Sequence, residues 1–391
     1  MKFIRNHTSI LFFTGLLVMI VLLAACGTSK KNASIPLQSA KEVMAVIDKV
    51  NTYWQKANPD HGRAFWDNAA YHTGNMEVYG LTNNGEYKKY SEAWAQKNNW
   101  MGATSNNKAE WKYNYGEKPE YVLFGDWQIC FQTYIDLYNV QPDEKKVARA
   151  KEVMGYEIST TENKYWWWAD GLYMVMPVMT KMFKLTGEKK YLDKLYEYYN
   201  YANSIMYDST EKIYYRDAKY VYPKHKTSNG KKDFWARGNG WVFAALAKVL
   251  KDLPKDDTHR NEYIAKFKGM AQTLKNYQQA DGHWTRSIMD TAQSPGYETS
   301  GTAFFTYAFL WGINNGYLDR KEFLPIADKG WQYLVNIAMQ LDGKIGYVQP
   351  IGERAIPGQV VDKNSTANFG VGAFLLAACE RYRFMEQKIK K

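Results

Sequence analysis

Apolar residues recur at spacings of three and four along most of the chain, which is the period of an amphipathic α-helix. The spacing is clearest in residues 41–58, 86–100, 188–206 and 262–279. Short stretches rich in glycine, asparagine or proline interrupt the pattern at 82–86, 186–189, 253–257 and 314–320. Alternating, strand-like patterns are scarce, so the sequence predicts an all-α protein.

Six strongly apolar segments form a second class of predicted helix, and each follows a polar residue with glycine or tryptophan nearby. The six polar residues are His72, Asp126, Asp170, Arg237, Glu298 and Asn368. Successive starts are 44 (126 to 170) to 70 (298 to 368) residues apart, which leaves room for one apolar and one amphipathic helix. Because apolar helices are buried and amphipathic ones lie outside, this order predicts six inner and six outer helices, an (α/α)6 toroid.

The chain also shows an internal similarity. Residues 77–94 and 181–198 share an aromatic residue, a Leu-Thr pair, a glycine and then an amphipathic helix. A helical hairpin used repeatedly gives such a pattern. If inner and outer helices alternate, the inner helices run the same way and their N-terminal ends meet at one mouth. Unpaired N–H groups and positive dipole ends there suit an anionic ligand.

The first residues read as a targeting segment. Lys2 and Arg5 precede an apolar run at 10–25, which is short for a membrane span and typical of a signal peptide. The run ends in "LAAC", which resembles the lipobox of bacterial lipoproteins. We therefore expect a signal peptide at 1–25, lipidation of Cys26, a flexible tether at 26–38 and a catalytic domain at 39–391. An ordinary secretory signal or a membrane anchor are the alternatives. The expected location is an exported, membrane-anchored lipoprotein, periplasmic or on the cell surface.

Composition excludes some classes of function. The formal net charge is +11, but the basic residues are dispersed, which argues against nucleic-acid binding. Aromatic residues make up 16 % of the chain, as expected for rings that stack on sugars or fill a large helical core. Cys130 and Cys379 lie in apolar segments and are expected to be core residues. Neither a zinc-type spacing nor a calcium-type loop is present, so we expect no metal.

Asp170 lies in the stretch "YWWWADGLYM" (165–174) as the only charged residue between Lys164 and Lys181. It is either a helix N-cap or a catalytic acid whose pKa the surrounding rings raise by desolvation. Asp126 occupies an equivalent helix start, where an aspartate by itself is more often a cap. As a site residue it is the natural partner of Asp170, because two inward-facing carboxyl groups are the minimum for sugar chemistry.

The stretch "DFWARGNGWVF" (233–243) places Arg237 between Trp235 and Trp241. A guanidinium can bind a carboxylate bidentately, and the flanking rings suit a ring-shaped acidic ligand; bracing of a glycine-rich turn is the alternative. His72 and Arg216 are further candidates for substrate binding, and Glu298 stands at another helix start. Their structural alternatives are a hydrogen-bonded core histidine for His72, a loop cation for Arg216 and a helix cap for Glu298.

Four motifs in order, "YHTGN", "WWWADGLYM", "FWARGNGW" and "NFGVGAFLLA", resemble glycoside hydrolase family 105, the unsaturated rhamnogalacturonyl hydrolases, and its relative family 88. The resemblance implies an (α/α)6 toroid that acts on the Δ4,5-unsaturated uronic acid left by polysaccharide lyases, without a cofactor. It also implies a general acid/base role for Asp170 and a second carboxylate at Asp126. The residues that it places around the uronate are Trp168, Trp235, Arg237 and Trp241. Where some members have a histidine, this chain has Arg216.

The expected reaction is hydration of the C4=C5 enol ether, with protonated Asp170 as acid and charged Asp126 keeping it protonated. Arg237 would hold the substrate carboxylate, and Trp168 or Trp241 would stack on the sugar. The expected partner is an unsaturated acidic oligosaccharide, with membrane contact only through the lipid at Cys26. A conventional inverting (α/α)6 glycosidase and a non-catalytic glycan-binding lipoprotein are the alternatives.

Overall fold

A computed structural model describes residues 39–389, with side chains to residue 387. The expected signal peptide, Cys26 and the tether lie outside the described residues. The helices are α1 (Ala40–Ala57), α2 (Trp66–Thr82), α3 (Gly85–Lys97), α4 (Gly125–Gln128), α5 (Cys130–Val140), α6 (Ala148–Ser159), α7 (Ala169–Thr186), α8 (Lys190–Met206), α9 (Ala236–Asp252), α10 (Arg260–Leu274), α11 (Thr299–Asn314), α12 (Arg320–Tyr333) and α13 (Asn368–Ile389). Two-residue strands β1 (Tyr207–Asp208) and β2 (Ile213–Tyr214) pair antiparallel.

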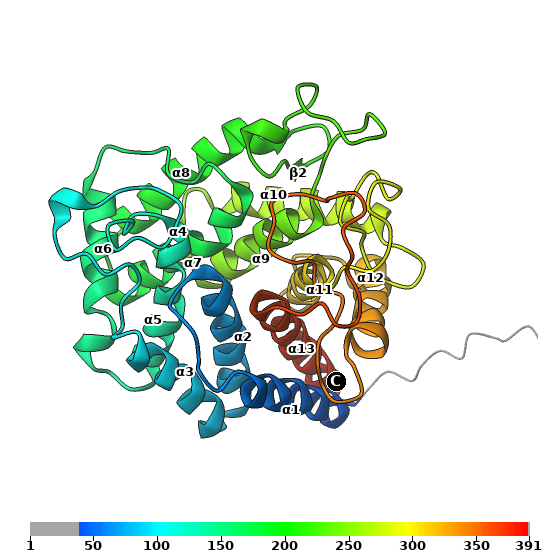
Figure 1. The fold of residues 1–391 in the computed structure, drawn as a ribbon, viewed down its shortest axis with the longest axis horizontal. Coiled ribbons are helices and arrows are strands. Elements are labelled where there is room, and N and C mark those ends of the chain that lie inside the picture. Colours follow the sequence, from blue (N-terminus) through cyan, green and yellow to red (C-terminus); the bar gives the residue numbers. More distant parts are fainter. Residues whose placement is uncertain (1–38, 390–391) are drawn as a thin grey trace, which may run out of the picture. The chain divides into compact units, whose positions relative to one another are not determined.

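The apolar helices form an inner ring within these residues. Each packs against the next in the order α2, α4 with α5, α7, α9, α11 and α13, and α13 closes the ring against α2. Helices α1, α3, α6, α8, α10 and α12 lie outside them (Figure 1). The (α/α)6 toroid predicted from the order of apolar and amphipathic segments is therefore confirmed.

Five of the six predicted helix starts are within one residue of the observed ones. Asp126, Asp170 and Arg237 are the second residues of α4, α7 and α9, Glu298 is the N-cap of α11, and Asn368 begins α13. The start at His72 was wrong, because α2 begins at Trp66 and carries His72 into the middle of the helix. The prediction followed the glycine after His72, whereas the helix starts where the apolar residues 64–66 become buried.

Glycines allow the first and last inner helices, α2 and α13, to pack closely enough to close the ring. A Cβ on Gly74 of α2 would lie 2.4 Å from the carbonyl oxygen of Gly372 on α13. A Cβ on Gly372 would lie 2.3 Å from the carbonyl oxygen of Ala70. Side chains at these positions would push the two backbones apart, so the closure depends on the glycines of the "YHTGN" and "NFGVGAF" motifs.

Cys130 and Cys379 are buried and are not joined by a disulfide, in agreement with their interpretation as core residues. No helix among residues 39–389 is long and apolar enough to cross a membrane.

Candidate active site

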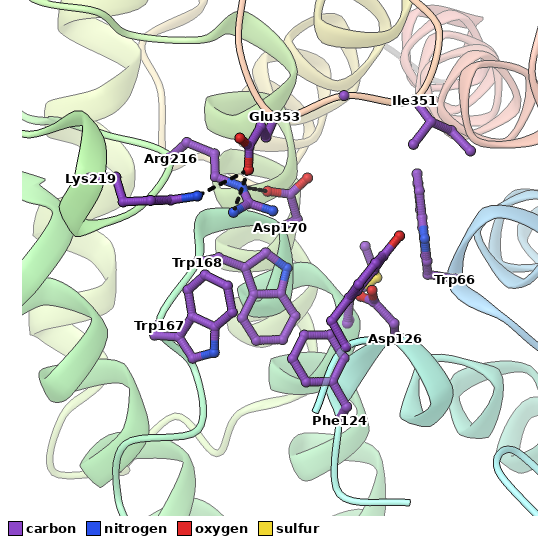
Figure 2. Close-up of a pocket in the computed structure, with 13 residues that line it drawn as sticks. Trp66, Phe124, Asp126, Trp167, Trp168, Asp170, Arg216, Lys219, Ile351 and Glu353 are labelled. Carbon is purple, nitrogen blue, oxygen red and sulfur yellow. Dashed lines mark hydrogen bonds and ion pairs between the residues drawn. The ribbon is translucent and has the colours of Figure 1, made fainter. Parts of the chain in front are cut away.

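A cavity of about 310 Å³ opens where the inner helices α4 and α7 begin. It is lined by Trp66, Tyr115, Phe124, Asp126, Trp167, Trp168, Asp170, Met174, Arg216, Lys219, Ile351, Gly352 and Glu353. Figure 2 shows Trp167 and Trp168 on one side and Trp66 on the other. The predicted residues Asp126, Asp170, Trp168 and Arg216 therefore meet in one cavity, although 90 residues separate the first from the last.

Asp170 is held at the start of α7 without capping it. The N-cap is Trp168, and no side chain caps this helix end. The backbone N–H of Ala169 donates to the carbonyl oxygen of Arg216 at 2.8 Å, which fixes the following turn. A Cβ on Gly171 would lie 2.9 Å from the ring of Trp168, so the ring packs directly over the backbone. The Asp170 carboxyl group lines the cavity, and its side chain is 13 % exposed.

Burial raises the pKa of both aspartates, and the charges next to each one then make the two pKa values different. The charge of Asp170 raises the pKa of Asp126 further, to well above its ordinary value. Burial also raises the pKa of Asp170, but the guanidinium groups of Arg216 and Arg237 oppose that rise. The cations beside Asp170 therefore favour its ionised form, whereas the surroundings of Asp126 favour its protonated form. This is the reverse of the sequence-based interpretation, in which Asp126 supplied the charge, because the sequence did not show that Arg216 lies beside Asp170.

Arg216 is the cation at the centre of the site. Its Nε lies 3.4 Å from Oδ2 of Asp170, and its Nη1 lies 2.7 Å from Oδ2 of Asp217 and 3.4 Å from Oε2 of Glu353. Nη2 has no hydrogen-bond or ion-pair partner among residues 39–389. One edge of the guanidinium is therefore left to donate to a ligand in the cavity.

Asn239 of the "WARGNGW" motif helps to place Arg216. Its side-chain amide donates to the carbonyl oxygen of Tyr214 at 2.8 Å, and its Oδ1 accepts from the N–H of the same residue at 2.8 Å. Both bonds fasten β2 to α9 two residues before Arg216. The buried asparagine, which the sequence analysis did not single out, thus fixes the loop that carries the cation.

Arg237 does not face the cavity, contrary to the prediction that it holds the substrate carboxylate. Its Nη1 donates to the carbonyl oxygen of Gln349 at 2.6 Å, and its Nη2 donates to those of Pro350 at 2.9 Å and Gly352 at 3.4 Å. The guanidinium lies over the rings of Trp235 and Phe369 and is 1 % exposed. Burial lowers the pKa of Arg237 to about 10. Arg237 braces the loop that brings Ile351 and Glu353 to the cavity.

Glu298 supports the same loop. Its carboxylate accepts from the N–H groups of Ser300 at 2.9 Å and Gly301 at 2.7 Å, which is the helix cap expected from the sequence. It also accepts from the N–H of Gln349 at 3.2 Å. The cap of α11 and the cavity loop therefore share one buried carboxylate.

Three other predicted contact residues lie outside the cavity. Trp241 is fully buried against Tyr173 and Phe304. Trp235 is also buried and donates from Nε1 to Gln349 at 2.8 Å. His72 stacks on Trp94 at 4.0 Å between ring centroids and hydrogen-bonds Ser91. These residues are buried in the core around the site and do not line the cavity.

Sequence reasoning missed nine of the thirteen residues that line the cavity. Trp167 lies within the stretch "YWWWADGLYM" and Phe124 lies two residues before Asp126, so both could have been found beside the predicted carboxyl groups. Phe124 stacks on Trp168 at 4.5 Å with an interplanar angle of 8°. Tyr115, Ile351 and Glu353 come from irregular loops with no periodic signal, and only the tertiary structure brings them to the cavity.

Comparisons of this chain with known proteins agree on one family. The family model described as Glycosyl Hydrolase Family 88 matches residues 38–385. The unsaturated 3S-rhamnoglycuronyl hydrolase of Formosa agariphila is 33 % identical over 348 residues, which covers 85 % of this chain and 89 % of that protein.

Solved structures agree on the fold. A glycosyl hydrolase family 88 structure from Bacteroides vulgatus is 60 % identical, with a TM-score of 0.87, and covers 89 % of this chain and 100 % of its own. A chain described as a polysaccharide lyase is 65 % identical, with a TM-score of 0.87 over 89 % and 98 % of the two chains. A family 105 glycoside hydrolase from C. acetobutylicum has the same fold at 23 % identity, with a TM-score of 0.67 over 88 % and 99 %.

Proposed function

The chain belongs to glycosyl hydrolase family 88, and from its cavity we propose that it removes a terminal Δ4,5-unsaturated uronic acid from oligosaccharides made by polysaccharide lyases. One observation carries the proposal: two buried carboxyl groups with raised pKa values and a partly free guanidinium converge in a cavity walled by aromatic rings. Carboxyl groups supply proton transfer, the guanidinium binds an acid, and the rings stack on a sugar.

We also propose that rhamnose follows the uronate, as in substrates of the family 105 type. The curated relative is named for a rhamnoglycuronyl substrate, whereas the motif resemblance points to a rhamnogalacturonyl one. The two uronic acids differ only at C4, and the C4=C5 double bond removes that stereocentre. Both names therefore describe the same terminal sugar linked to rhamnose.

Arg216 is the proposed receptor for the uronate carboxylate. Its Nη2 is the unpartnered edge of a guanidinium that already lies 3.4 Å from Asp170, so a carboxylate bound there places the neighbouring C4 and C5 near the acid. Arg216, in place of Arg237, takes this role because the Nη atoms of Arg237 already donate to three backbone carbonyl groups.

Binding at Arg216 prepares Asp170 to act as the acid. The guanidinium holds back the pKa of Asp170 in the empty cavity. A substrate carboxylate that pairs with Arg216 adds negative charge and weakens this effect, so the pKa of Asp170 rises. We propose that the two electrostatically coupled aspartates then hold their proton preferentially on Asp170, which donates it to C4 of the enol ether.

Protonation of C4 leaves positive charge on C5 and the ring oxygen. Water adds to C5, and the Asp170 carboxylate takes the proton that the water releases, so the acid is restored. The product is a hemiketal at C5. Its ring opens to a ketone, and the hemiacetal at C1 then releases the remaining sugar as an alcohol. Asp126, which lines the same cavity, orients the sugar hydroxyl groups.

The test follows the ultraviolet absorbance of the conjugated double bond. Purified protein with an unsaturated uronyl-rhamnose disaccharide should remove the absorbance, and Asp170→Asn should not. A conventional inverting glycosidase would release sugar from saturated oligosaccharides, and a glycan-binding protein would bind without turnover. A lyase would raise the absorbance of an intact polyuronide. Any of these three results, with no loss of absorbance from the disaccharide, would refute the proposal.

We propose that Cys26 carries a lipid that anchors the enzyme to a bacterial membrane, on the sequence evidence of the "LAAC" motif. Cys26→Ala should move the protein from the membrane fraction to the soluble fraction without changing its turnover of the disaccharide. Recovery of both forms from the same membrane fraction would argue against the anchor.

A further inference from the structure

A second cavity, of about 240 Å³, lies where the loop after α1 meets α2 and the start of α13. Among the described residues, it shares no lining residue with the catalytic cavity. Asn68 lines the second cavity two residues after Trp66, which lines the first, so both open at the end of the toroid where inner helices begin. His72, which lies outside the catalytic cavity, lines this one. None of its residues takes part in the proposed reaction.

Aromatic rings make up much of the lining of this second cavity. The ring of His61 meets Tyr90 edge-on, with 4.4 Å between centroids. The ring of His72 stacks on the same tyrosine at 5.7 Å, with an interplanar angle of 21°. Trp54 and Tyr71 complete the aromatic part. A largely apolar, aromatic lining with a few polar groups is typical of a small-molecule site, and such rings pack against the C–H face of a sugar.

Four polar atoms around the cavity have no hydrogen-bond partner among residues 39–389. Asn368 donates from Nδ2 to Oδ1 of Asn68 at 2.8 Å, which leaves the Asn68 Nδ2 donor and the Asn368 Oδ1 acceptor unpaired. Asn58 donates from Nδ2 to the carbonyl oxygen of Trp54 at 2.9 Å, which leaves its Oδ1 unpaired. Nδ1 of His61 is buried and unpartnered. Hydroxyl groups both donate and accept, so a ligand that carries several of them satisfies these atoms.

The loop after α1 holds the cavity in shape without a ligand. Gly62 has a φ of 75°, and a Cβ there would lie 2.5 Å from Oδ1 of Asn68, so the amide packs directly on the loop backbone. Helix α3 and the residue after it fasten the same loop. Lys97 donates from Nζ to the carbonyl oxygen of Asp60 at 2.7 Å, and Asn98 donates from Nδ2 to that of Gly62 at 3.1 Å. The unpaired amide atoms are therefore fixed in position.

The charges around the cavity favour an uncharged ligand. Its described lining contains neither lysine nor arginine, and its carboxylate, from Asp60, pairs with Lys97. Burial lowers the pKa of His61 and of His72, so both imidazoles are neutral at neutral pH. A carboxylate or sulfate ligand would lose its hydration without gaining an unpaired cation.

We propose that this second cavity is a binding site for a neutral sugar residue. Its volume is below the roughly 300–1,000 Å³ of sites for drug-sized ligands and suits a single sugar ring. The aromatic rings take the C–H face of that sugar, and the unpaired amide and imidazole atoms take its hydroxyl groups. The site does not depend on the proposed function. It adds to that function a second hold on the saccharide, at the same end of the toroid as the catalytic cavity.

The experiment measures the binding of L-rhamnose, D-xylose and D-galactose to the purified protein by saturation-transfer NMR, with D-glucuronate as the charged comparison. At least one neutral sugar should bind with a Kd in the millimolar range, as expected for so small a ligand. Ala57→Phe adds a ring to an exposed position in the lining and should raise that Kd by about 10-fold or more. Ala109→Phe adds the same ring at an exposed alanine outside both cavities and should leave the Kd unchanged.

Asn68→Asp tests the free amide donor with little change of shape. The carboxylate still accepts from Asn368, but an oxygen takes the place of Nδ2, so the Kd for the neutral sugar should rise by about 10-fold. Asn336→Asp makes the same change at an exposed position outside both cavities and should bind as wild type does. The Tm of each variant reports whether it is folded.

Binding needs no turnover, so these results do not depend on whether the proposed function is right. Failure of all three neutral sugars to bind in the millimolar range would overturn the inference. A Kd that either Ala57→Phe or Asn68→Asp leaves unchanged would also overturn it, because the sugar would then bind elsewhere on the protein. Binding of D-glucuronate that Ala57→Phe abolishes would show that the choice of a neutral ligand is wrong.

Discussion

Replacement of Arg237 by methionine tests whether this residue holds the substrate or the loop. The structure gives it two short hydrogen bonds, at 2.6 Å to Gln349 and 2.9 Å to Pro350. Bonds from a charged donor contribute about 1.5–3 kcal/mol each, so their gross contribution is about 3–6 kcal/mol. Burial lowers the pKa of Arg237 from 12.5 to about 10, which corresponds to about 3 kcal/mol against the charged form. The variant loses this penalty but leaves buried carbonyl groups unpaired, at about 1–3 kcal/mol each.

We therefore expect Arg237→Met to lower the free energy of unfolding by about 2–4 kcal/mol. The unfolding entropy of about 350 residues is about 0.7 kcal/mol per degree, so Tm should fall by about 3–5 °C. The loop that carries Ile351 and Glu353 should also become more accessible, which limited proteolysis within residues 349–356 would report. KM should rise moderately through the displaced lining.

Arg286 provides the matched control. It too is buried and donates to backbone carbonyl groups, those of Gln359 at 2.8 Å and Pro295 at 3.0 Å, but it does not line the cavity. Arg286→Met should lower Tm similarly and leave KM nearly unchanged. If Arg237→Met instead keeps its Tm and raises KM by 100-fold or more (about 3 kcal/mol), Arg237 binds the substrate directly and the reasoning is wrong.

Three further predictions follow from buried titratable groups. The alkaline limb of kcat/KM reports loss of the last proton from the aspartate pair, which the charge of Asp170 holds on Asp126 by raising its pKa. Asp126→Asn leaves only Asp170, whose pKa Arg216 and Arg237 oppose, so the limb should move to lower pH. An unmoved limb would contradict the coupling of the two aspartates. Burial raises the pKa of Glu157 from 4.5 to about 8, so the folded state retains a proton that the unfolded chain releases, and stability should fall as pH rises from 4.5 to 8. Urea unfolding at both pH values should show a smaller fall in Glu157→Gln than in wild type, and an equal fall would count against this assignment. Burial also raises the pKa of the Cys130 and Cys379 thiols. In a chain that lacks residues 1–38, both thiols should therefore react with a thiol reagent only after denaturation. A thiol that reacts fast under native conditions would show that one of these cysteines is not buried.

The sequence predicts the fold well because the fold depends on a pattern that repeats. Each inner helix is apolar on nearly all sides, since it packs between two inner neighbours and an outer helix. Each outer helix is amphipathic, since one face meets solvent. Six alternations of these two patterns leave few arrangements other than a closed double ring. His72 shows the limit of this reasoning, because the boundary of α2 depends on which residues become buried and not on the nearest glycine.

The sequence predicts a site residue only where that residue stands at the start of an inner helix. Asp126 and Asp170 are the second residues of α4 and α7, so the fold that the pattern predicts also predicts that they converge. Arg237 is in the same position on α9, yet its long side chain reaches backbone carbonyl groups instead of the cavity. The position of a residue at the mouth follows from sequence periodicity, but the direction of a flexible side chain does not.

The sequence by itself determined the double ring of helices and the pair of carboxyl groups at its mouth, because both follow from the spacing of apolar and polar residues along the chain. Only the tertiary structure decided that Arg216 lies beside Asp170, that Arg237 braces a loop and that Glu353 pairs with Arg216. Those outcomes depend on contacts between segments as far apart as Arg216 and Glu353, which are 137 residues apart (216 to 353). Irregular loops that make such contacts have no periodic pattern, since each of their residues is placed by a different neighbour.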